Sequence, residues 1–328
     1  MKKIGIKGTG SCIPEREIPN SYFEKIVDTT DEWIVSRTGI RTRRMVEPGQ
    51  GLSDLATPAS GKALEMAGLS PEKLDMIIVG TSTADMLSPS AACLIQYQLG
   101  ARNAVAFDVN AACPGFIYGL AVAQKFMQDG SCHHVLVVGG EIVSNRIDYK
   151  DRATCVLFGD GAGAVVLGHS NSNGDGEIVD VQIESDGTLW DLIHVPGGGS
   201  RIPPSQQMLD EGLHYVKMQG NEVFKNAVRI MVDSAVKAMG SKGITSDEID
   251  WFIPHQANMR IMGTVAGRLG IPLEKVIITV HKYGNTSAAS IPTALDEAVR
   301  SGKIQRGDLI LTSSFGAGLT WGSALFRY

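Results

Sequence analysis

The sequence lacks the features that mark membrane, disulfide-stabilised and metal-binding proteins. It has no apolar run long enough to span a bilayer, and its first residues carry lysines without the apolar segment of a secretion signal. Its five cysteines include no Cys-x-x-Cys pair, and its seven histidines form no His-Glu-x-x-His motif. We therefore expect a cytoplasmic protein with no metal site, no disulfide framework and no membrane contact.

Charge is also sparse in this chain. Charged residues make up 20% of it and the net charge is -5, which gives no general attraction to nucleic acid. Hydrophobic residues make up 43% of the 328 residues, the balance of an ordinary globular protein. The length favours two domains or one large two-part core, and no nucleic-acid partner is expected.

The chain repeats its own pattern at a spacing of roughly 170 to 175 residues, which indicates a duplicated domain. In each copy a short apolar strand precedes a Leu-Gly pair, a second strand, a helix ended by glycine, a third strand and a glycine-rich strand. The matching segments are 70–79 with 245–254, 99–100 with 269–270, 104–109 with 276–280, Gly130 with Gly302, 135–138 with 309–312, and 158–167 with 315–326. We predict two similar halves, residues 1–175 and 176–328.

Strand-like runs that alternate with helical stretches indicate an α/β protein with mixed or parallel sheets covered by helices. Helices are predicted over residues 53–68, with Ser53 as the N-cap, and over residues 218–239. Residues 185–212 are rich in Asp, Gly, Pro and Ser and have no counterpart in the other half. We expect a loop or linker there.

Cys113 lies where an expected strand stops and a helix begins. Pro114 suits the first helical position, which places Cys113 at the N-cap, where unpaired amides and the helix dipole favour a thiolate. This position predicts a nucleophile. The other four cysteines are interpreted as small buried hydrophobic residues, the usual fate of a free cysteine: Cys12, Cys93, Cys132 and Cys155.

His255 and Asn285 also follow strand-like runs. A lone histidine is usually only hydrogen-bonded, and an asparagine in a turn is usually a cap or turn residue. In the repeat, however, the turn of Asn285 falls opposite the turn of Cys113. Equivalent turns of two pseudo-symmetric halves would meet at one site, so we predict that Cys113, His255 and Asn285 share a site.

Four segments, in order along the chain, resemble the signature blocks of β-ketoacyl-acyl carrier protein synthase III, a condensing enzyme of the thiolase superfamily. They are Ala-Cys-Pro-Gly-Phe at 112–116, Pro-His-Gln-Ala-Asn at 254–258, Gly-Asn-Thr-Ser-Ala-Ala-Ser at 284–290 and Gly-Ala-Gly-Leu-Thr-Trp-Gly at 316–322. The resemblance runs nearly end to end. It implies a thiolase-like duplicated αβαβα layered fold with two pseudo-symmetric halves, assembled as a homodimer.

The resemblance also implies the reaction, a decarboxylative condensation of an acyl-coenzyme A primer with malonyl-acyl carrier protein that initiates fatty acid biosynthesis. Coenzyme A enters as part of a substrate, and no cofactor is expected. Cys113 would carry the acyl group, His255 and Asn285 would stabilise the enolate, and the backbone amides of Cys113 and Ala317 would hold the oxyanion.

Three further groups of residues take roles from the resemblance. Coenzyme A binding is assigned to Trp33, Arg37, Arg152, Phe224 and Asn258. Docking of the acidic carrier protein is assigned to Lys225, Arg260 and Arg268, although Gly267 stands where relatives often have a second basic residue. The primer pocket is assigned to Met86, Leu87, Ser88 and Phe315, and Ser88 stands where relatives restricted to short primers often have an aromatic residue.

Two other functions stay open at this point. A specialised acyltransferase or an aromatic-starter condensing enzyme of secondary metabolism would carry the same three residues. A cysteine hydrolase is the more distant alternative, because the separation of Cys113 and His255 fits papain-like proteases. The chain lacks the Cys-Gly-Ser-Cys-Trp motif of those proteases.

Overall fold

Two β-sheets organise the computed structural model, which describes residues 3–170 and 176–328. The first sheet has the strand order β1-β7-β6-β4-β5, and the second has the order β11-β12-β13-β8. Their strands are β1 (Lys3–Cys12), β4 (Met76–Gly80), β5 (Val105–Val109), β6 (His134–Glu141), β7 (Gly161–Ser170), β8 (Glu177–Ser185), β11 (Trp251–Pro254), β12 (Leu309–Gly316) and β13 (Thr320–Arg327). Two small pairs join β2 (Glu17–Pro19) to β3 (Thr42–Arg44), and β9 (Ile193–His194) to β10 (Lys217–Met218).

The two sheets repeat one pattern of strand directions. Strand β4 runs parallel to β6, while β6 with β7 and β7 with β1 are antiparallel. The same sequence of one parallel and two antiparallel pairs links β11, β12, β13 and β8. Each sheet takes its strands from one side of the expected domain boundary at residue 175, which itself lies outside the described residues. The division into two domains stays a prediction.

The prediction of a strand over residues 276–280, the second strand of the repeat in the C-terminal half, is wrong. Within the described residues Val276 makes only an isolated bridge to Phe252, and the helix α10 (Val280–Tyr283) begins where the strand was expected to end. The side chain of Gln256 explains the difference. Its carboxamide oxygen accepts hydrogen bonds from the amides of Thr279 and Val280, so these amides start a helical turn instead of pairing in a ladder.

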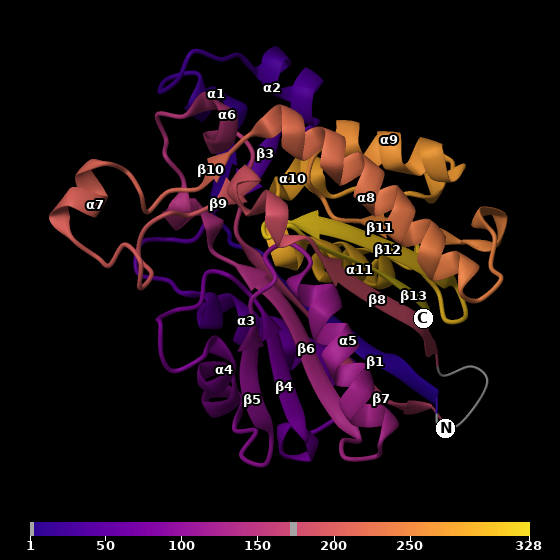
Figure 1. Cartoon of the computed structure of the whole chain (residues 1–328). Coiled ribbons are helices and arrows are strands. Elements are labelled where there is room, and N and C mark those ends of the chain that lie inside the picture. The colour runs from indigo at the N-terminus through magenta and orange to yellow at the C-terminus, as the bar shows by residue number, and fades with distance from the viewer. Residues whose placement is uncertain (1–2, 171–175) are drawn as a thin grey trace.

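Helices and sheets alternate in five layers (Figure 1). Helices α3 (Leu52–Ala67) and α4 (Ala91–Leu99) cover the outer face of the first sheet, and α8 (Gly220–Gly240) and α9 (Met259–Leu269) cover the second. Helices α5 (Gly115–Gln128) and α11 (Ser290–Arg300) lie between the sheets. The remaining helices are α1 (Asn20–Phe23), α2 (Asp31–Thr38), α6 (Arg152–Cys155) and α7 (Gln206–Asp210), with 3₁₀ turns at Pro71–Lys73, Val143–Arg146, Gly187–Leu192, Ser246–Glu248, Leu273–Lys275 and Ser287–Ala289.

The two middle helices approach the ends of the central strands closely because glycine stands at the points of contact. A Cβ atom on Gly80, at the end of β4, would lie 2.3 Å from the carbonyl carbon of Gly115 at the start of α5. A Cβ atom on Gly139 of β6 would lie 2.2 Å from the carbonyl oxygen of Ala288. Real side chains cannot occupy that space. These glycines therefore let the first turn of α5 and the 3₁₀ turn that precedes α11 approach the ends of the central strands.

The predicted helices are largely confirmed, with shifted ends. Helix α3 spans the expected region, but its N-cap is Gly51, not Ser53, because the Asp54 carboxylate accepts the Gly51 amide hydrogen bond. The glycine helix ends are confirmed, since Gly130 and Gly302 have φ of +82° and +74°. The expected loop over residues 185–212 contains short elements, namely a 3₁₀ turn, β9 and α7. No helix within the described residues combines the length and apolar character needed to cross a membrane.

Candidate active site

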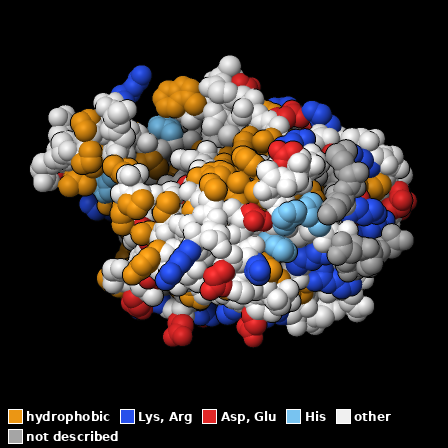
Figure 2. Space-filling model, turned by 90° about the horizontal axis from the view of Figure 1, so that it is seen from below, with side chains coloured by type: hydrophobic (Ala, Val, Ile, Leu, Met, Phe, Trp, Pro, Cys, Tyr) orange, Lys and Arg blue, Asp and Glu red, His pale blue; other side chains and the backbone are white. Residues whose placement is uncertain are grey.

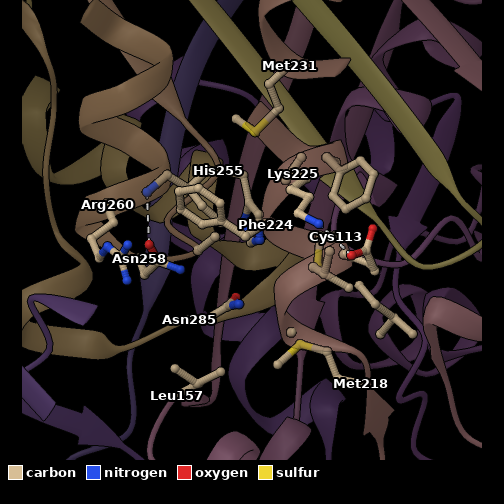
Figure 3. Close-up of a pocket in the computed structure, with 18 of the residues that line it drawn as sticks. Cys113, Leu157, Met218, Phe224, Lys225, Met231, His255, Asn258, Arg260 and Asn285 are labelled. Carbon is tan, nitrogen blue, oxygen red and sulfur yellow. Dashed lines mark hydrogen bonds and ion pairs between the residues drawn. The ribbon is translucent and has the colours of Figure 1, made fainter. Parts of the chain in front are cut away.

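A cavity of about 480 Å3 brings the three predicted site residues together. Cys113 at the start of α5, His255 after β11, and Asn285 after α10 all line it, as Figure 3 shows. Apolar side chains make up much of the remaining wall, among them Leu157, Phe158, Val223, Met218, Met231, Ile193 and Phe315. Few polar groups thus converge in a largely apolar space, the usual character of a substrate pocket.

Cys113 lies one residue earlier relative to the helix than the sequence predicts. Helix α5 begins at Gly115 and its N-cap is Pro114, so the prediction of Cys113 as the N-cap is wrong by one position. The cause is the preceding turn, in which Ala112 adopts a left-handed φ of +49° and its carbonyl accepts the Gly115 amide. A left-handed conformation is rare for alanine, and such backbone strain is concentrated at functional sites.

The thiol of Cys113 is protonated in the resting site, contrary to the expected thiolate. Loss of water around the sulfur is the main reason that its pKa is raised to about 12; the hydrogen bond from the Ser287 hydroxyl lowers the pKa, and the charge of Glu141, a smaller effect, raises it. The helix terminus does not outweigh the loss of water around the sulfur. Cys113 must therefore lose its proton during the reaction.

His255 is fixed by two contacts at the end of β11. Its amide donates to the Ser313 carbonyl of β12 at 2.8 Å, and its ring Nδ1 lies 2.7 Å from the Ser290 hydroxyl of α11. Burial lowers the pKa of the imidazole to about 4, so the ring is neutral. When Ser290 donates to Nδ1, the ring hydrogen resides on Nε2 and His255 acts as a hydrogen-bond donor.

Asn285 is held by its backbone and by its side-chain oxygen. Its amide donates to the Leu157 carbonyl at 2.8 Å, and its Oδ1 accepts from the Ser287 amide at 2.9 Å. Because Oδ1 accepts this hydrogen bond, the Nδ2 group, which carries two hydrogens, is left to donate to a ligand. Figure 3 labels Asn285 among the side chains that surround the cavity, together with His255 and Cys113.

The β12–β13 turn closes the site on the backbone side of Cys113. A Cβ atom on Gly316 would lie 2.9 Å from the Cys113 amide nitrogen, so only glycine allows this approach. The Thr320 hydroxyl contacts the Ala111 carbonyl at 2.9 Å and the Ala317 carbonyl at 2.8 Å, which ties the two turns together. Ala317, predicted to supply an oxyanion amide, is thus held beside the Cys113 turn.

The residues predicted to bind coenzyme A fall into two adjoining groups. Phe224 and Asn258 line the cavity, and the Asn258 side chain also caps α9. Outside the cavity lining, the guanidinium groups of Arg152 and Arg37 lie 4.8 Å and 5.8 Å from the centre of the Trp33 ring. Helix α2, which carries Trp33 and Arg37, packs against α9. The two groups therefore occupy neighbouring positions on one side of the molecule.

The three basic residues predicted to dock a carrier protein are exposed, but only two of them line the cavity. Lys225 lines it and pairs with Glu222 at 2.7 Å. Arg260 lines it as well, 5.3 Å from the Phe224 ring. Arg268 lies outside the lining, in the last turn of α9.

The four residues predicted for the primer pocket do not lie together within one chain. Phe315 lines the cavity. Met86, Leu87 and Ser88 are exposed in the loop between β4 and α4, outside that lining, and the Leu87 side chain is 94% exposed. Within one chain this loop therefore leaves the cavity open.

Sequence reasoning missed Glu141 and did not single out Ser287 or Ser290. Glu141 ends the apolar strand β6 and is fully buried, and Ser287 lies between it and Cys113. A carboxyl group at the exit of an apolar strand was a usable signal, since the same rule located His255. Ser287 and Ser290 belong to the segment 284–290, in which a role was predicted from the sequence for Asn285 only.

Comparisons with known proteins agree with this geometry. The family model described as 3-oxoacyl-[acyl-carrier-protein (ACP)] synthase III matches residues 107–187, and the model of its C-terminal part matches residues 239–328. The beta-ketoacyl-[acyl-carrier-protein] synthase III of Caldanaerobacter subterraneus is 52% identical over 99% of this chain and 97% of its own. The chain belongs to the 3-oxoacyl-[acyl-carrier-protein] synthase III family. The resemblance found in the sequence is thereby confirmed.

Solved structures of the synthase III family share the fold over the whole chain. The enzyme from Aquifex aeolicus has a TM-score of 0.92 with 46% identity, covering 99% of this chain and 100% of that one. The thiolase-like αβαβα fold is confirmed. A priming beta-ketosynthase of the R1128 polyketide pathway is also similar, at 38% identity, 99% and 96% coverage and a TM-score of 0.91.

The neutral state of His255 predicts how malonyl decarboxylation depends on pH. Because burial lowers the imidazole pKa from 6.5 to about 4, the donor form persists well below neutral pH. Carbon dioxide release from malonyl-acyl carrier protein without primer should be nearly constant between about pH 5.5 and about pH 8. An inflection near the ordinary histidine pKa would contradict this assignment.

Proposed function

We propose that this chain performs the decarboxylative condensation of an acyl-coenzyme A primer with malonyl-acyl carrier protein and so initiates fatty acid biosynthesis. The observation that carries the proposal is a partly buried thiol that shares one cavity with two neutral hydrogen-bond donors, His255 and Asn285. Each group suits one task. The thiol holds an acyl group, and the donors stabilise negative oxygen.

The first half-reaction would load the primer on Cys113. The sulfur attacks the thioester carbonyl, the carbonyl oxygen becomes negative, and the amides of Cys113 and Ala317 stabilise it. Thr320 supports this arrangement, because its contacts with the carbonyls of Ala111 and Ala317 hold both turns in register. Collapse of the tetrahedral intermediate releases coenzyme A.

The second half-reaction would decarboxylate the malonyl group. Its thioester carbonyl faces His255 Nε2 and Asn285 Nδ2, and loss of carbon dioxide leaves an enolate whose oxygen both groups contact. Neutral donors suit this step, since their hydrogen bonds strengthen as the oxygen gains charge. The enolate carbon then attacks the acyl-Cys113 thioester and forms the β-ketoacyl product.

The division of labour predicts different defects for the three variants. Cys113→Ala should abolish acyl transfer but retain primer-independent decarboxylation, since the thiol does not contact the enolate oxygen. His255→Ala and Asn285→Ala should each lose decarboxylation by about 10²- to 10³-fold, the usual effect of removing one oxyanion donor. Carbon dioxide release without primer measures this, and full activity of either donor variant would refute the assigned roles.

Coenzyme A binding would use the Trp33 stack and the cavity mouth. The adenine can stack on Trp33 beside an arginine, and the guanidinium groups of Arg37 and Arg152 can pair with phosphates. Arg152 is oriented in advance, because its Nη1 donates to the Asp28 carbonyl at 2.8 Å. The pantetheine arm would then pass Phe224 and Asn258 toward Cys113.

Substitution of the two arginines should weaken primer binding without slowing the chemistry. Arg37→Ala and Arg152→Ala should raise the KM for acetyl-coenzyme A about three- to tenfold each, because both side chains are exposed. The rate of condensation on pre-acylated enzyme should change little. Arg306→Ala is a matched control, since Arg306 stacks 4.1 Å from the Tyr328 ring outside the cavity lining. If the KM for acetyl-coenzyme A were unchanged in both variants, the assignment of coenzyme A binding to these arginines would be wrong.

Carrier-protein docking would use the exposed cations at the cavity mouth. Lys225 and Arg260 line the cavity, and Arg268 lies two helical turns beyond Arg260 on α9. An acidic carrier protein would be attracted to these charges, and its prosthetic arm would enter the same opening as coenzyme A. Arg268→Ala should raise the KM for malonyl-acyl carrier protein at low salt, and the increase of that KM with added salt should be smaller than in the wild type. An unchanged KM and an unchanged salt dependence would contradict this docking surface.

Assembly as a homodimer would cover the open edge of the first sheet. Strand β5 is the last strand of that sheet, and its residues are partly exposed. Large hydrophobic side chains are exposed nearby, including Leu87, Tyr97 and Val105. Figure 2, seen from below, shows hydrophobic side chains over the left half and the middle of this face, and Figure 1 draws α4 and β5 on the lower side of the molecule. Pairing of two β5 edges would bury them, and Met86, Leu87 and Ser88 of one copy would close the acyl pocket of the other.

A charge on the β5 edge should therefore separate the subunits. Sedimentation velocity should show a dimer for the wild type and a monomer for Val105→Asp. Val236→Asp, which alters a similarly exposed valine on the outer helix α8, should stay dimeric. A monomeric wild type, or a dimeric Val105→Asp variant, would contradict the proposed interface.

The alternative functions differ in how well the site supports them. A priming synthase of secondary metabolism would use the same cavity. The similarity to the priming beta-ketosynthase of the R1128 pathway supports this alternative. Such an enzyme would be recognised if Cys113 were acylated faster by another acyl-coenzyme A than by acetyl-coenzyme A. A cysteine hydrolase requires a thiolate and an imidazolium, whereas burial here raises the thiol pKa to about 12 and lowers the imidazole pKa to about 4. The site does not support the hydrolase.

A further inference from the structure

Glu141 is a buried carboxyl group at the end of β6 that none of the steps above uses. It has no exposed surface. Its oxygens accept hydrogen bonds from the Ser82 amide at 3.1 Å, from the Ser82 hydroxyl at 2.9 Å, and from the hydroxyls of Thr81, Thr83 and Ser287. Among the described residues its partners include no cation. Keeping such a group buried is costly, and costly buried groups are often functional.

Ser287 connects this carboxyl group to the nucleophile. Its Oγ lies 3.4 Å from Cys113 Sγ and 3.3 Å from Glu141 Oε1. The backbone of Ser287 has a left-handed φ of +49°, and its amide donates to Asn285 Oδ1. The strained turn thus holds one hydroxyl group between the thiol and the carboxyl group, and a hydroxyl can accept one proton while it gives up another.

We propose that Ser287 and Glu141 form the proton path for acylation of Cys113. The thiol proton moves to Ser287 Oγ while the Ser287 hydroxyl proton moves to Glu141 Oε1, and the sulfur attacks the thioester carbonyl. This inference rests on the proposed function, because it concerns the first half-reaction. Ser287 contacts the nucleophile directly, and Glu141 acts through it.

The path conserves charge within the buried site. Before transfer the negative charge resides on Glu141, and after transfer it resides on the sulfur, so no additional charge is taken out of water. Burial also raises the pKa of Glu141, which makes the carboxylate a stronger base. His255 is a poor alternative base, since burial lowers its pKa to about 4.

The proton has a destination when the intermediate collapses. In the tetrahedral intermediate the Cys113 sulfur and the coenzyme A sulfur are bonded to the same carbon, so both lie near Ser287. The carbon–sulfur bond to coenzyme A breaks, and the proton returns from Glu141 through Ser287 to the leaving sulfur. The products are acyl-Cys113, neutral coenzyme A thiol and the original Glu141 carboxylate.

Glu141→Gln tests the path, because it keeps the side-chain size and removes the base. Single-turnover acylation by acetyl-coenzyme A, followed by intact mass, should slow about 10²- to 10³-fold near pH 7 with little change in KM. The titratable group in contact with this network is Cys113, so the variant must depend on spontaneous thiol ionisation. Because burial raises the pKa of that thiol to about 12, the acylation rate of the variant should rise about tenfold per pH unit without a plateau between about pH 6 and about pH 9, more steeply than the wild-type rate.

Conservative variants separate proton transfer from a structural role. Glu141→Asp should recover part of the lost rate, and Ser287→Ala should show the same slow, steeply pH-dependent acylation as Glu141→Gln. Asp160→Asn is the matched control, because Asp160 is also buried and accepts from the Ser144 hydroxyl at 2.6 Å. This variant should acylate at the wild-type rate.

Two results would overturn the path while leaving the proposed condensation intact. One is a Glu141→Gln variant, shown to be folded by its thermal unfolding, that acylates as fast as the wild type. The other is a slow variant whose rate follows the wild-type pH profile, which would indicate a structural defect. If Glu141→Gln does not fold, Glu141→Asp and Ser287→Ala give the same comparison. Failure of the wild type itself to acylate would count against the proposed function instead.

Discussion

Burial of one thiol is the constraint on which the rest of the site depends. Enclosure raises the pKa of Cys113 to about 12, so the nucleophile is stable against ionisation until a substrate arrives. Burial also lowers the pKa of His255 to about 4 and keeps its ring neutral, and hydrogen bonds to a developing negative oxygen are stronger where water is largely excluded. A site built on neutral donors and a protonated thiol suits carbon–carbon bond formation, in which an enolate must be stabilised without being protonated.

The duplicated architecture explains how residues far apart in sequence reach one cavity. Each half places turns at the ends of its central strands, and glycines allow the first turn of α5 and the 3₁₀ turn before α11 to approach those strands. The Cys113 turn comes from one half and the Asn285 turn from the other. Ser287 contacts Cys113 across this junction, and Thr320 ties the Ala317 turn to the same backbone. Three turns that contact one another therefore form the site.

Much of this could be predicted from the sequence because it depends on local patterns. Strand-to-helix turns located Cys113, and glycine positions marked the ends of helices. The strand over residues 276–280 could not be excluded, because the Gln256 side chain that captures its amides is distant in sequence. The protonation state of Cys113 could not be predicted from local pattern either. The start of a helix favours a thiolate, and only the packed structure shows that burial raises the pKa of the thiol by more than the helix start lowers it. The position of Glu141 at the exit of an apolar strand could have been noted, but its link to Cys113 through Ser287 of the other half is visible only in the structure.

The central claim is that Cys113 carries an acyl group that is then condensed with a malonyl group. The most direct measurement is sequential: acylation by acetyl-coenzyme A followed by intact mass and peptide mapping, then addition of malonyl-acyl carrier protein with detection of the products. The account predicts one acetyl group on Cys113, its disappearance on the second addition, and equal amounts of carbon dioxide and β-ketoacyl-acyl carrier protein. Release of free acetate, or transfer of the acetyl group without carbon dioxide, would contradict it.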